Sequence, residues 1–414
     1  MSKLTDKIMY PRLNLIWVFM IISSVLFCLL YLWFTVFPGQ VNPEAWQYFS
    51  SEQIANSREY SRTDQLLFIT GIILRAGFLL WFVFSGKAVA FSDWLENHIK
   101  NYWCYLFVFF FVLWFLLKLI DLPVTLYGGY FFQHNWGFST QTMGAVWLDF
   151  IKRSVLSLIV FATGFMLLFW CFVRCPKTWW LIGAVIVSLW MFFQIFLWPV
   201  VISPIFNRFE PANDPAIINM VQNISHKAGI SIDQVLIMDA SRRTTQADAY
   251  FTGFGNTKRI VLYDTLLKDY PFDQVEAAVA HEMGHWKEGH LIKGLLRDIL
   301  INFVLWGFIY MLIKTIISTA TRYPAHIWPV IMLFFLLVSF TGTPLKNYIS
   351  RNMEKEADAV AVMLTNNAEA AVRLHVDLSV KNMSDVSPPA FIRWFDYSHP
   401  PVMERIKNIM QNQR

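Results

Sequence analysis

The sequence predicts a mostly α-helical protein that crosses a membrane about seven times and carries a smaller α/β segment outside the membrane. Hydrophobic residues make up 56% of the 414 residues and charged residues only 15%, which is more apolar than a water-soluble chain of this length requires. Seven apolar runs are long enough to cross the hydrocarbon core, which takes about 20 helical residues. Between the fifth and sixth runs the pattern changes to that of a soluble α/β protein.

The seven runs determine the predicted division of the chain. In order, they are Leu13–Phe37, Leu66–Phe84, Tyr102–Ile120, Val155–Val173, Trp179–Ile205, Ile299–Ala320 and Ile327–Thr343. The first run is too long for the apolar core of a signal peptide, so we interpret it as a retained helix. We expect five spans in residues 1–205, a soluble segment in 206–298, two spans in 299–343 and a second soluble part in 344–414.

A few charged residues fall inside the predicted spans. Arg75 has about nine span residues on each side, so it needs an internal aqueous space or an internal partner. For Lys118, Asp121 and Lys314, reaching the membrane surface is an equally good explanation. The short loops on the two sides carry similar numbers of Lys and Arg, so the charge bias leaves the orientation undecided. No basic run interleaved with aromatic residues suggests a nucleic-acid partner.

The soluble segment after the fifth span alternates helical and extended patterns. We expect a helix at Pro215–Lys227 and strands at Gln234–Met238, Ala249–Phe254 and Arg259–Tyr263. The second and third strands should form a hairpin, because Gly253, Gly255 and Asn256 supply turn residues between them. Another helix should begin near Pro271, with apolar positions at Val275, Ala278, Val279 and Met283.

A metal-binding pattern lies on this last helix. His281 and His285 are four residues apart, so both imidazoles project from one face and can share a metal ion. Glu282 is offset around the helix, where its carboxylate can reach a water on the metal rather than the metal itself. This arrangement is typical of zinc metalloproteases. The alternative is an exposed helix with two unrelated histidines.

A catalytic zinc site needs a third protein ligand and leaves the fourth position to water. Glu354 and Asp358, directly after the seventh span, project from one helical face. Glu354 can bind the metal while Asp358 accepts a hydrogen bond from a histidine ligand. We expect one Zn²⁺ per chain. A charged, solvated helix is the alternative for this segment. Glu356 should point elsewhere, and His290 and Glu288 should lie at the surface or behind the ligands.

Five segments in order then resemble one family, the type I CAAX prenyl proteases, which are integral-membrane zinc endopeptidases of the gluzincin group. The segments are Leu122–Tyr127 with Trp136–Phe138, Pro204–Phe209, Tyr250–Phe254, Lys258–Leu267, and Tyr397–Pro401 with Glu404 and Arg405. The resemblance implies a gluzincin-like α/β metallopeptidase domain, and seven helices around a water-filled chamber that would surround Arg75. It also implies peptide or protein substrates, prenylated or membrane-associated ones included.

The resemblance also implies roles for individual residues. His281, His285 and Glu354 would bind zinc, Glu282 would be the general base, and His399 would stabilise the oxyanion. The edge strand that pairs with an extended substrate would comprise Asp248, Ala249, Tyr250, Phe251 and Thr252. The metallopeptidase domain would be cytoplasmic, in a bacterial cell (inner) membrane by preference, or in an endoplasmic reticulum membrane if the chain is eukaryotic.

Two positions depart from the family pattern. Asp248 stands where the family has Asn, which affects the substrate hydrogen bonds of the edge strand. Gln133 and His134 precede Trp136 where the family has an acidic residue, which affects fine substrate preference.

Three other classes share part of the pattern. An intramembrane protease of the site-2 type would carry its HExxH motif inside an apolar span, whereas charged residues flank this one. A heat-shock-type quality-control metalloprotease would have fewer spans before the motif. A non-catalytic zinc-bearing scaffold or channel would have no use for Glu282.

Overall fold

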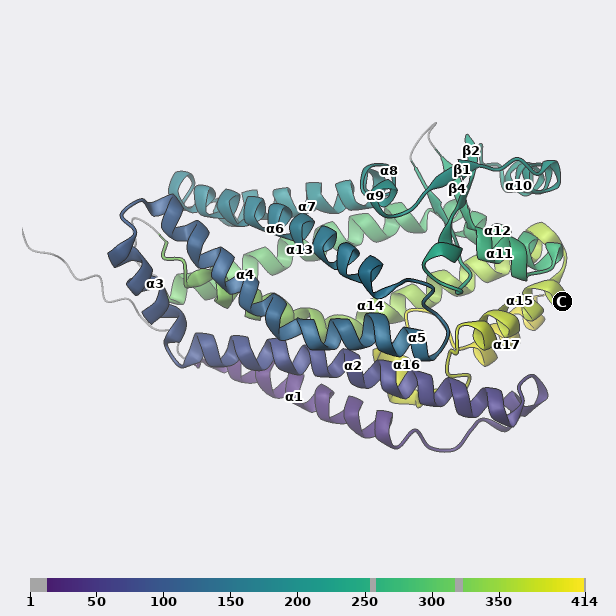
Figure 1. Ribbon diagram of the computed structural model, residues 1–414, viewed down its shortest axis with the longest axis horizontal. Helices are drawn as coiled ribbons and strands as arrows, with labels where there is room; N and C mark the ends of the chain where they lie inside the picture. The colour runs from purple at the N-terminus through teal and green to yellow at the C-terminus, as the bar shows by residue number, and fades with distance from the viewer. Residues whose placement is uncertain (1–12, 254–257, 317–322, 413–414) are drawn as a thin grey trace, which may run out of the picture.

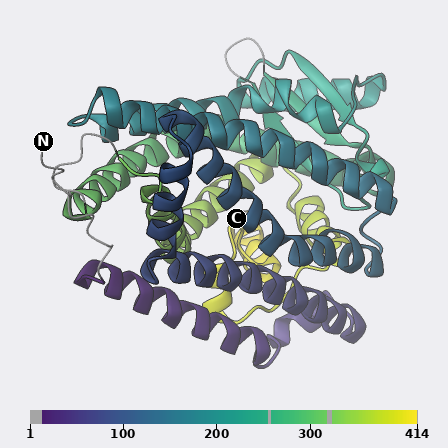
Figure 2. The ribbon, with the colours of Figure 1, turned by 60° about the vertical axis from the view of Figure 1, so that its left-hand side comes forward.

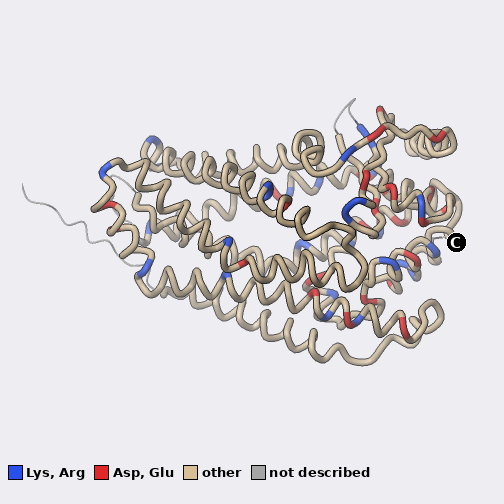
Figure 3. The backbone as a smooth tube through the Cα atoms, in the orientation of Figure 1, with Lys and Arg blue, Asp and Glu red and all other residues tan. Residues whose placement is uncertain are grey.

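The computed structural model describes residues 13–253, 258–316 and 323–412. Long helices form an elongated bundle, and a small sheet with several shorter helices lies at one end of it (Figure 1). Within the described ranges, seven helices are long and apolar enough to cross a membrane. This confirms the predicted number of spans. Charged residues concentrate at the end that holds the sheet, whereas the long helical part is largely uncharged (Figure 3).

The spanning helices run well beyond most of the predicted apolar runs. They are α1 (Leu15–Val36), α2 (Ser51–Phe84), α4 (Tyr102–Leu126), α6 (Met143–Arg174), α7 (Trp179–Phe196), α13 (His290–Ile316) and α14 (Ile327–Thr365). Hydropathy marks only the lipid-crossing part of a helix, while backbone hydrogen bonding continues past the lipid boundary. The predicted end of the sixth span, up to Ala320, lies outside the described residues.

The fifth span is shorter than predicted. The expected helix to Ile205 was wrong, because α7 ends at Phe196 and two single turns follow, α8 (Trp198–Val201) and α9 (Ser203–Phe206). Pro199 and Pro204 each begin a new turn, since proline has no backbone N–H to continue the preceding helix.

Shorter elements join the spans at both ends of the bundle. Helix α3 (Lys87–His98) lies at the end far from the sheet (Figure 1). A short 3₁₀ helix (Pro43–Gln47) precedes α2. After α4, the chain continues through a π-helical turn (Tyr127–Phe132) into α5 (Gln133–Asn135). The π turn follows Pro123, which interrupts the regular hydrogen bonding of α4.

The bundle packs around aromatic side chains. Trp17, Phe109, Phe165 and Trp179 are all fully buried in one apolar cluster. Helices α1 and α2 lie on the opposite side of the bundle from α6 and α7 (Figure 2).

The arginine in the second span forms an ion pair with a residue of α4, and both side chains are partly exposed. The Nε atom of Arg75 lies 3.4 Å from Oδ1 of Asp121 and donates to the Gly71 carbonyl. Lys118 and Lys314 lie over the rings of Trp114 and Tyr310. Arg75 therefore joins α2 to α4 through an ion pair.

Among the described residues, the sheet has four strands in the order β1-β2-β4-β3. They are β1 (Phe209–Pro211), β2 (Gln234–Met238), β3 (Ala249–Thr252) and β4 (Arg259–Tyr263). The antiparallel β3–β4 pair confirms the predicted hairpin, while β2 and β4 are parallel. Gly253 has a positive φ of 104°. The predicted strand end at Phe254 and the turn residues Gly255 and Asn256 lie outside the described residues.

The remaining helices are α10 (Pro215–Ala228), α11 (Asp264–Asp269), α12 (Phe272–Lys287), α15 (Ala368–Lys381), α16 (Ala390–Phe395) and α17 (Val402–Asn412). Apart from α16, they complete a second core around the sheet, while Ile392 and Phe395 of α16 pack with Tyr31, Ile69 and Phe340 of the spanning helices. Asp214 caps α10, and Pro215 occupies its first turn. Val279 and Met283 of α12 are fully buried against the sheet residues Ile260 and Leu262. The apolar core therefore fixes the position of α12, and with it the direction in which His281 and His285 project.

Candidate active site

The candidate site forms where α12 passes close to α14. A Cβ atom at Gly284 would lie 2.8 Å from the carbonyl oxygen of Ala357, so a larger residue there would push the two helices apart. Gly284 lies inside the HExxH motif and Ala357 follows Glu354 by three residues. This contact brings the two histidines of α12 to the carboxylate of α14.

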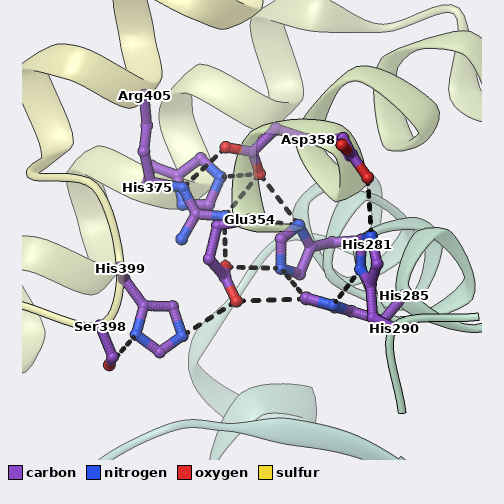
Figure 4. A network of polar contacts seen from close by, with 10 residues as sticks. His281, His285, His290, Glu354, Asp358, His375, Ser398, His399 and Arg405 are labelled. Carbon is purple, nitrogen blue, oxygen red and sulfur yellow. Dashed lines mark hydrogen bonds and ion pairs between the residues drawn. The ribbon is translucent and has the colours of Figure 1, made fainter. Parts of the chain in front are cut away.

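Three side chains offer potential ligand atoms around one point. The Nε2 atoms of His281 and His285 are 3.2 Å apart, and they lie 3.2 and 3.3 Å from Oε2 and Oε1 of Glu354 (Figure 4). A tetrahedral zinc site with bonds of 2.0–2.1 Å has ligand separations of about 3.3–3.4 Å. Oε2 of Glu354 is buried and makes no hydrogen bond among the described residues, although Nε2 of His281 is near. The donor set therefore fits a metal ion.

The second imidazole nitrogen of His281 contacts Asp358. Its Nδ1 atom lies 2.9 Å from Oδ1 of Asp358, and Arg405 donates to both oxygens of that carboxylate. His375 approaches Asp358 from α15 at 3.5 Å. A proton on Nδ1 leaves the Nε2 lone pair free for a metal. Asp358 was predicted to accept a hydrogen bond from a histidine ligand, and its contact with Nδ1 of His281 has the distance that this role requires.

His285 has a separate support from His290, which the sequence analysis expected at the surface or behind the ligands. Its Nδ1 atom lies 3.0 Å from Nδ1 of His290, and Nε2 of His290 lies 2.9 Å from Oε2 of Glu356. Glu356 is not among the side chains that converge on the metal position, and it contacts His290 at the start of α13 instead. Gly289 has a φ of +66° and turns the chain between α12 and α13. A glycine directly before His290 is the sequence signal for this turn, which brings His290 back toward His285.

Glu282 is not one of the three ligand groups. Burial raises the pKa of its carboxyl to about 7; His281 opposes this rise, and the carboxylates of Asp248 and Glu354 add to it. A carboxyl group with a pKa near neutrality can both accept and return a proton.

His399 comes from a different part of the chain. It follows α16, its side chain is exposed, and its Nε2 atom lies 3.4 Å from Oε1 of Glu354. Its Nδ1 atom contacts Oγ of Ser398 at 3.0 Å. The imidazole therefore stands across the ligand cluster from α12 (Figure 4).

The predicted substrate strand lies at the edge of the sheet. Strand β3 pairs with β4 on one side and has no strand partner on the other within the described residues. The ring of Phe251 packs on Trp286, one residue after His285, with centroids 4.7 Å apart. Asp248, just before β3, accepts the Ala249 N–H at 2.8 Å, and burial raises the pKa of its carboxyl. The edge of β3 is thus fixed beside the ligand helix.

Comparison with known proteins agrees with this architecture. Residues 35–208 match the family model described as CAAX prenyl protease N-terminal, five membrane helices, and residues 211–413 match peptidase family M48. The boundary between the two matches falls within β1, the first strand of the sheet.

Relatives match over most of the chain. An uncharacterized metalloprotease, YhfN of Bacillus subtilis, is 30% identical and covers 94% of each chain. CAAX prenyl protease 1 of Saccharomyces cerevisiae is 28% identical over 70% of this chain and 69% of its own length. The crystal structure of S. mikatae Ste24p shares the fold, with a TM-score of 0.82, 23% identity, and coverage of 95% and 98%. The chain therefore belongs to peptidase family M48 and is an integral-membrane metallopeptidase of the CAAX prenyl protease type.

Proposed function

We propose that the protein is a zinc-dependent endopeptidase that hydrolyses extended segments of peptide or protein substrates at the membrane. The observation that carries this proposal is the convergence of His281, His285 and Glu354, each of which offers one ligand atom within 4.8 Å of the other two. Two imidazoles and one carboxylate are a donor set that suits zinc in a catalytic site. Glu282 stands beside them as a base, which a purely structural site does not need.

The proposed chemistry follows from the positions of the side chains. A bound zinc ion would supply Lewis acidity toward the attacking water and the scissile carbonyl. Glu282 would take the proton from the water and return it to the leaving amine. His399, from the opposite wall, would donate a hydrogen bond to the developing oxyanion. Asp358 and His290 would hold the two imidazoles so that their Nε2 atoms face the metal.

Substrate binding would use the open edge of the sheet. An extended peptide can add to β3 through backbone hydrogen bonds, which requires the free edge at Ala249–Thr252. We propose that the substrates include prenylated or otherwise membrane-associated proteins, since the site lies where the spanning helices meet the charged end of the molecule. The relatives named CAAX prenyl protease 1 support this class of substrate.

We further propose that the metallopeptidase end is cytoplasmic, in a bacterial cell membrane or an endoplasmic reticulum membrane. Five candidate spans precede the sheet, so the start of α1 and the sheet would lie on opposite sides of the membrane. The match to the five-helix N-terminal model favours the CAAX type over the heat-shock type.

Metal removal tests the proposal directly. The purified protein should contain one zinc per chain and cleave a quenched fluorescent peptide. Stripping the metal with a chelator should abolish cleavage, and stoichiometric zinc should restore it. Full cleavage by the metal-free protein would contradict the proposed chemistry. A zinc-loaded protein without peptidase activity would instead favour the scaffold alternative.

Asp248→Asn should change the preference between substrate types. The Asp248 carboxylate lies directly before β3. Its negative charge would repel a substrate carboxylate, and it has no hydrogen with which to donate a hydrogen bond to a substrate carbonyl. The Asn variant should therefore cleave peptides with a free C-terminus several-fold faster, with a smaller effect on amidated peptides. Comparing kcat/KM for the two peptide forms measures this. Equal changes for both forms would mean that Asp248 does not face the substrate.

A further inference from the structure

Four polar residues form a buried stripe along α14. Asn347, Arg351, Glu354 and Asp358 are spaced by four, three and four residues, which places them on one face of the helix. Their exposed fractions are only 2–8%. Glu354 and Asp358 belong to the candidate metal site. Asn347 and Arg351 contact another segment, the one that leads to His399.

Asn347 and Arg351 bind backbone carbonyls at the end of α16. Nδ2 of Asn347 donates to the Phe395 carbonyl at 2.7 Å, and Nη1 of Arg351 donates to the Arg393 carbonyl at 2.9 Å and to that of Tyr397. The last carbonyls of a helix have no partner within the helix, so these side chains supply one. The end of α16 is therefore fastened to α14.

The first spanning helix adds a third attachment. The hydroxyl of Tyr31, a fully buried residue of α1, donates to Oδ2 of Asp396 at 2.8 Å. Its ring also packs edge-on against Phe395, with centroids 5.5 Å apart. Each residue from Phe395 to Tyr397 is thus attached to a spanning helix, and His399 follows two positions later.

The exposed ring of His399 has little support of its own. Among the described residues, its polar contacts are with the neighbouring Ser398 and with Glu354. Pro400 follows directly and restricts the backbone of His399. The direction of the imidazole therefore depends on where the backbone before it is held.

We infer that Asn347 and Arg351 are positioning residues that place His399 opposite the metal ligands, so that the membrane-spanning frame sets this wall of the site. Because Arg351 lies one turn before Glu354, a single helix determines the distance between His399 and the ligand carboxylate. The inference rests on the proposed function, which gives His399 its catalytic role.

Amide hydrogen exchange of the metal-free protein in detergent tests the attachment without any catalysis. Arg351→Gln and Asn347→Leu should each raise exchange at Asp396–His399 at least tenfold and leave the amides of α12 unchanged. The matched control is Arg373→Gln, which removes an exposed arginine that pairs with Asp273 and Glu369 on the outer surface. Because Asp273 belongs to α12, this control is read at Asp396–His399 alone, where exchange should not change. Unaltered exchange at Asp396–His399, or an equal rise in α12, would overturn the inference.

A double-mutant cycle tests the functional part. Arg351→Gln should lower kcat about tenfold in the wild-type background and less than twofold when His399→Ala is already present, because both changes remove the same contribution. KM and zinc stoichiometry should stay constant. Equal losses in the two backgrounds, or loss of zinc, would overturn the positioning role. Full activity of His399→Ala alone would refute the proposed catalytic role of His399. The hydrogen-exchange experiment would then still test whether Asn347 and Arg351 hold the segment before His399.

Discussion

Replacing Glu282 with Gln should leave the zinc content and the fold intact and lower kcat by about 10²- to 10⁴-fold, the range that general acid–base catalysis contributes. The amide has nearly the same shape but cannot accept the proton of the attacking water. Its side chain is not among the three atoms that converge on the metal position, so metal binding should not depend on it. Metal analysis and peptide cleavage on the same preparation measure both expectations.

Glu276→Gln is the matched control for this substitution. Glu276 lies on the same helix, six residues before Glu282, and outside the candidate site. Its replacement should leave both zinc content and kcat near wild type. If Glu282→Gln retained activity within about tenfold of wild type, Glu282 would not be the general base, and the non-catalytic scaffold would gain support.

The third ligand can be identified by comparing two carboxylates on α14. Glu354→Ala should lower zinc affinity more than about 100-fold, because two histidines alone hold the metal weakly. Glu356→Ala should retain one zinc per chain when zinc is saturating, since its carboxylate contacts His290 and not the metal position. Competition with a chromophoric chelator measures both affinities.

The opposite ranking would contradict the assignment. Full zinc affinity in Glu354→Ala together with loss in Glu356→Ala would make Glu356 the ligand and would require a different arrangement of α14. A loss of zinc in both variants would point to disruption of the α12–α14 contact, and circular dichroism of the two variants would reveal it.

Local patterns in the sequence were enough to predict much of this molecule. Hydropathy gives the number of spans because burial in lipid acts on each segment separately. The pairing of β3 with β4 follows from a short connection that contains Gly253. The spacing of His281 and His285 places both imidazoles on one face of any helix, whatever surrounds it.

Tertiary structure alone decided which distant residues meet these local elements. Glu354 reaches the histidines because Gly284 lets α12 approach α14 at Ala357, and no pattern within either helix contains that contact. His290 reaches Glu356, and Arg351 reaches the segment before His399, through chain reversals and helix packing rather than through spacing. Sequence determines the chemistry that each helix face presents, because a helical period is local. Packing determines which faces share a site, because such contacts join residues tens of positions apart.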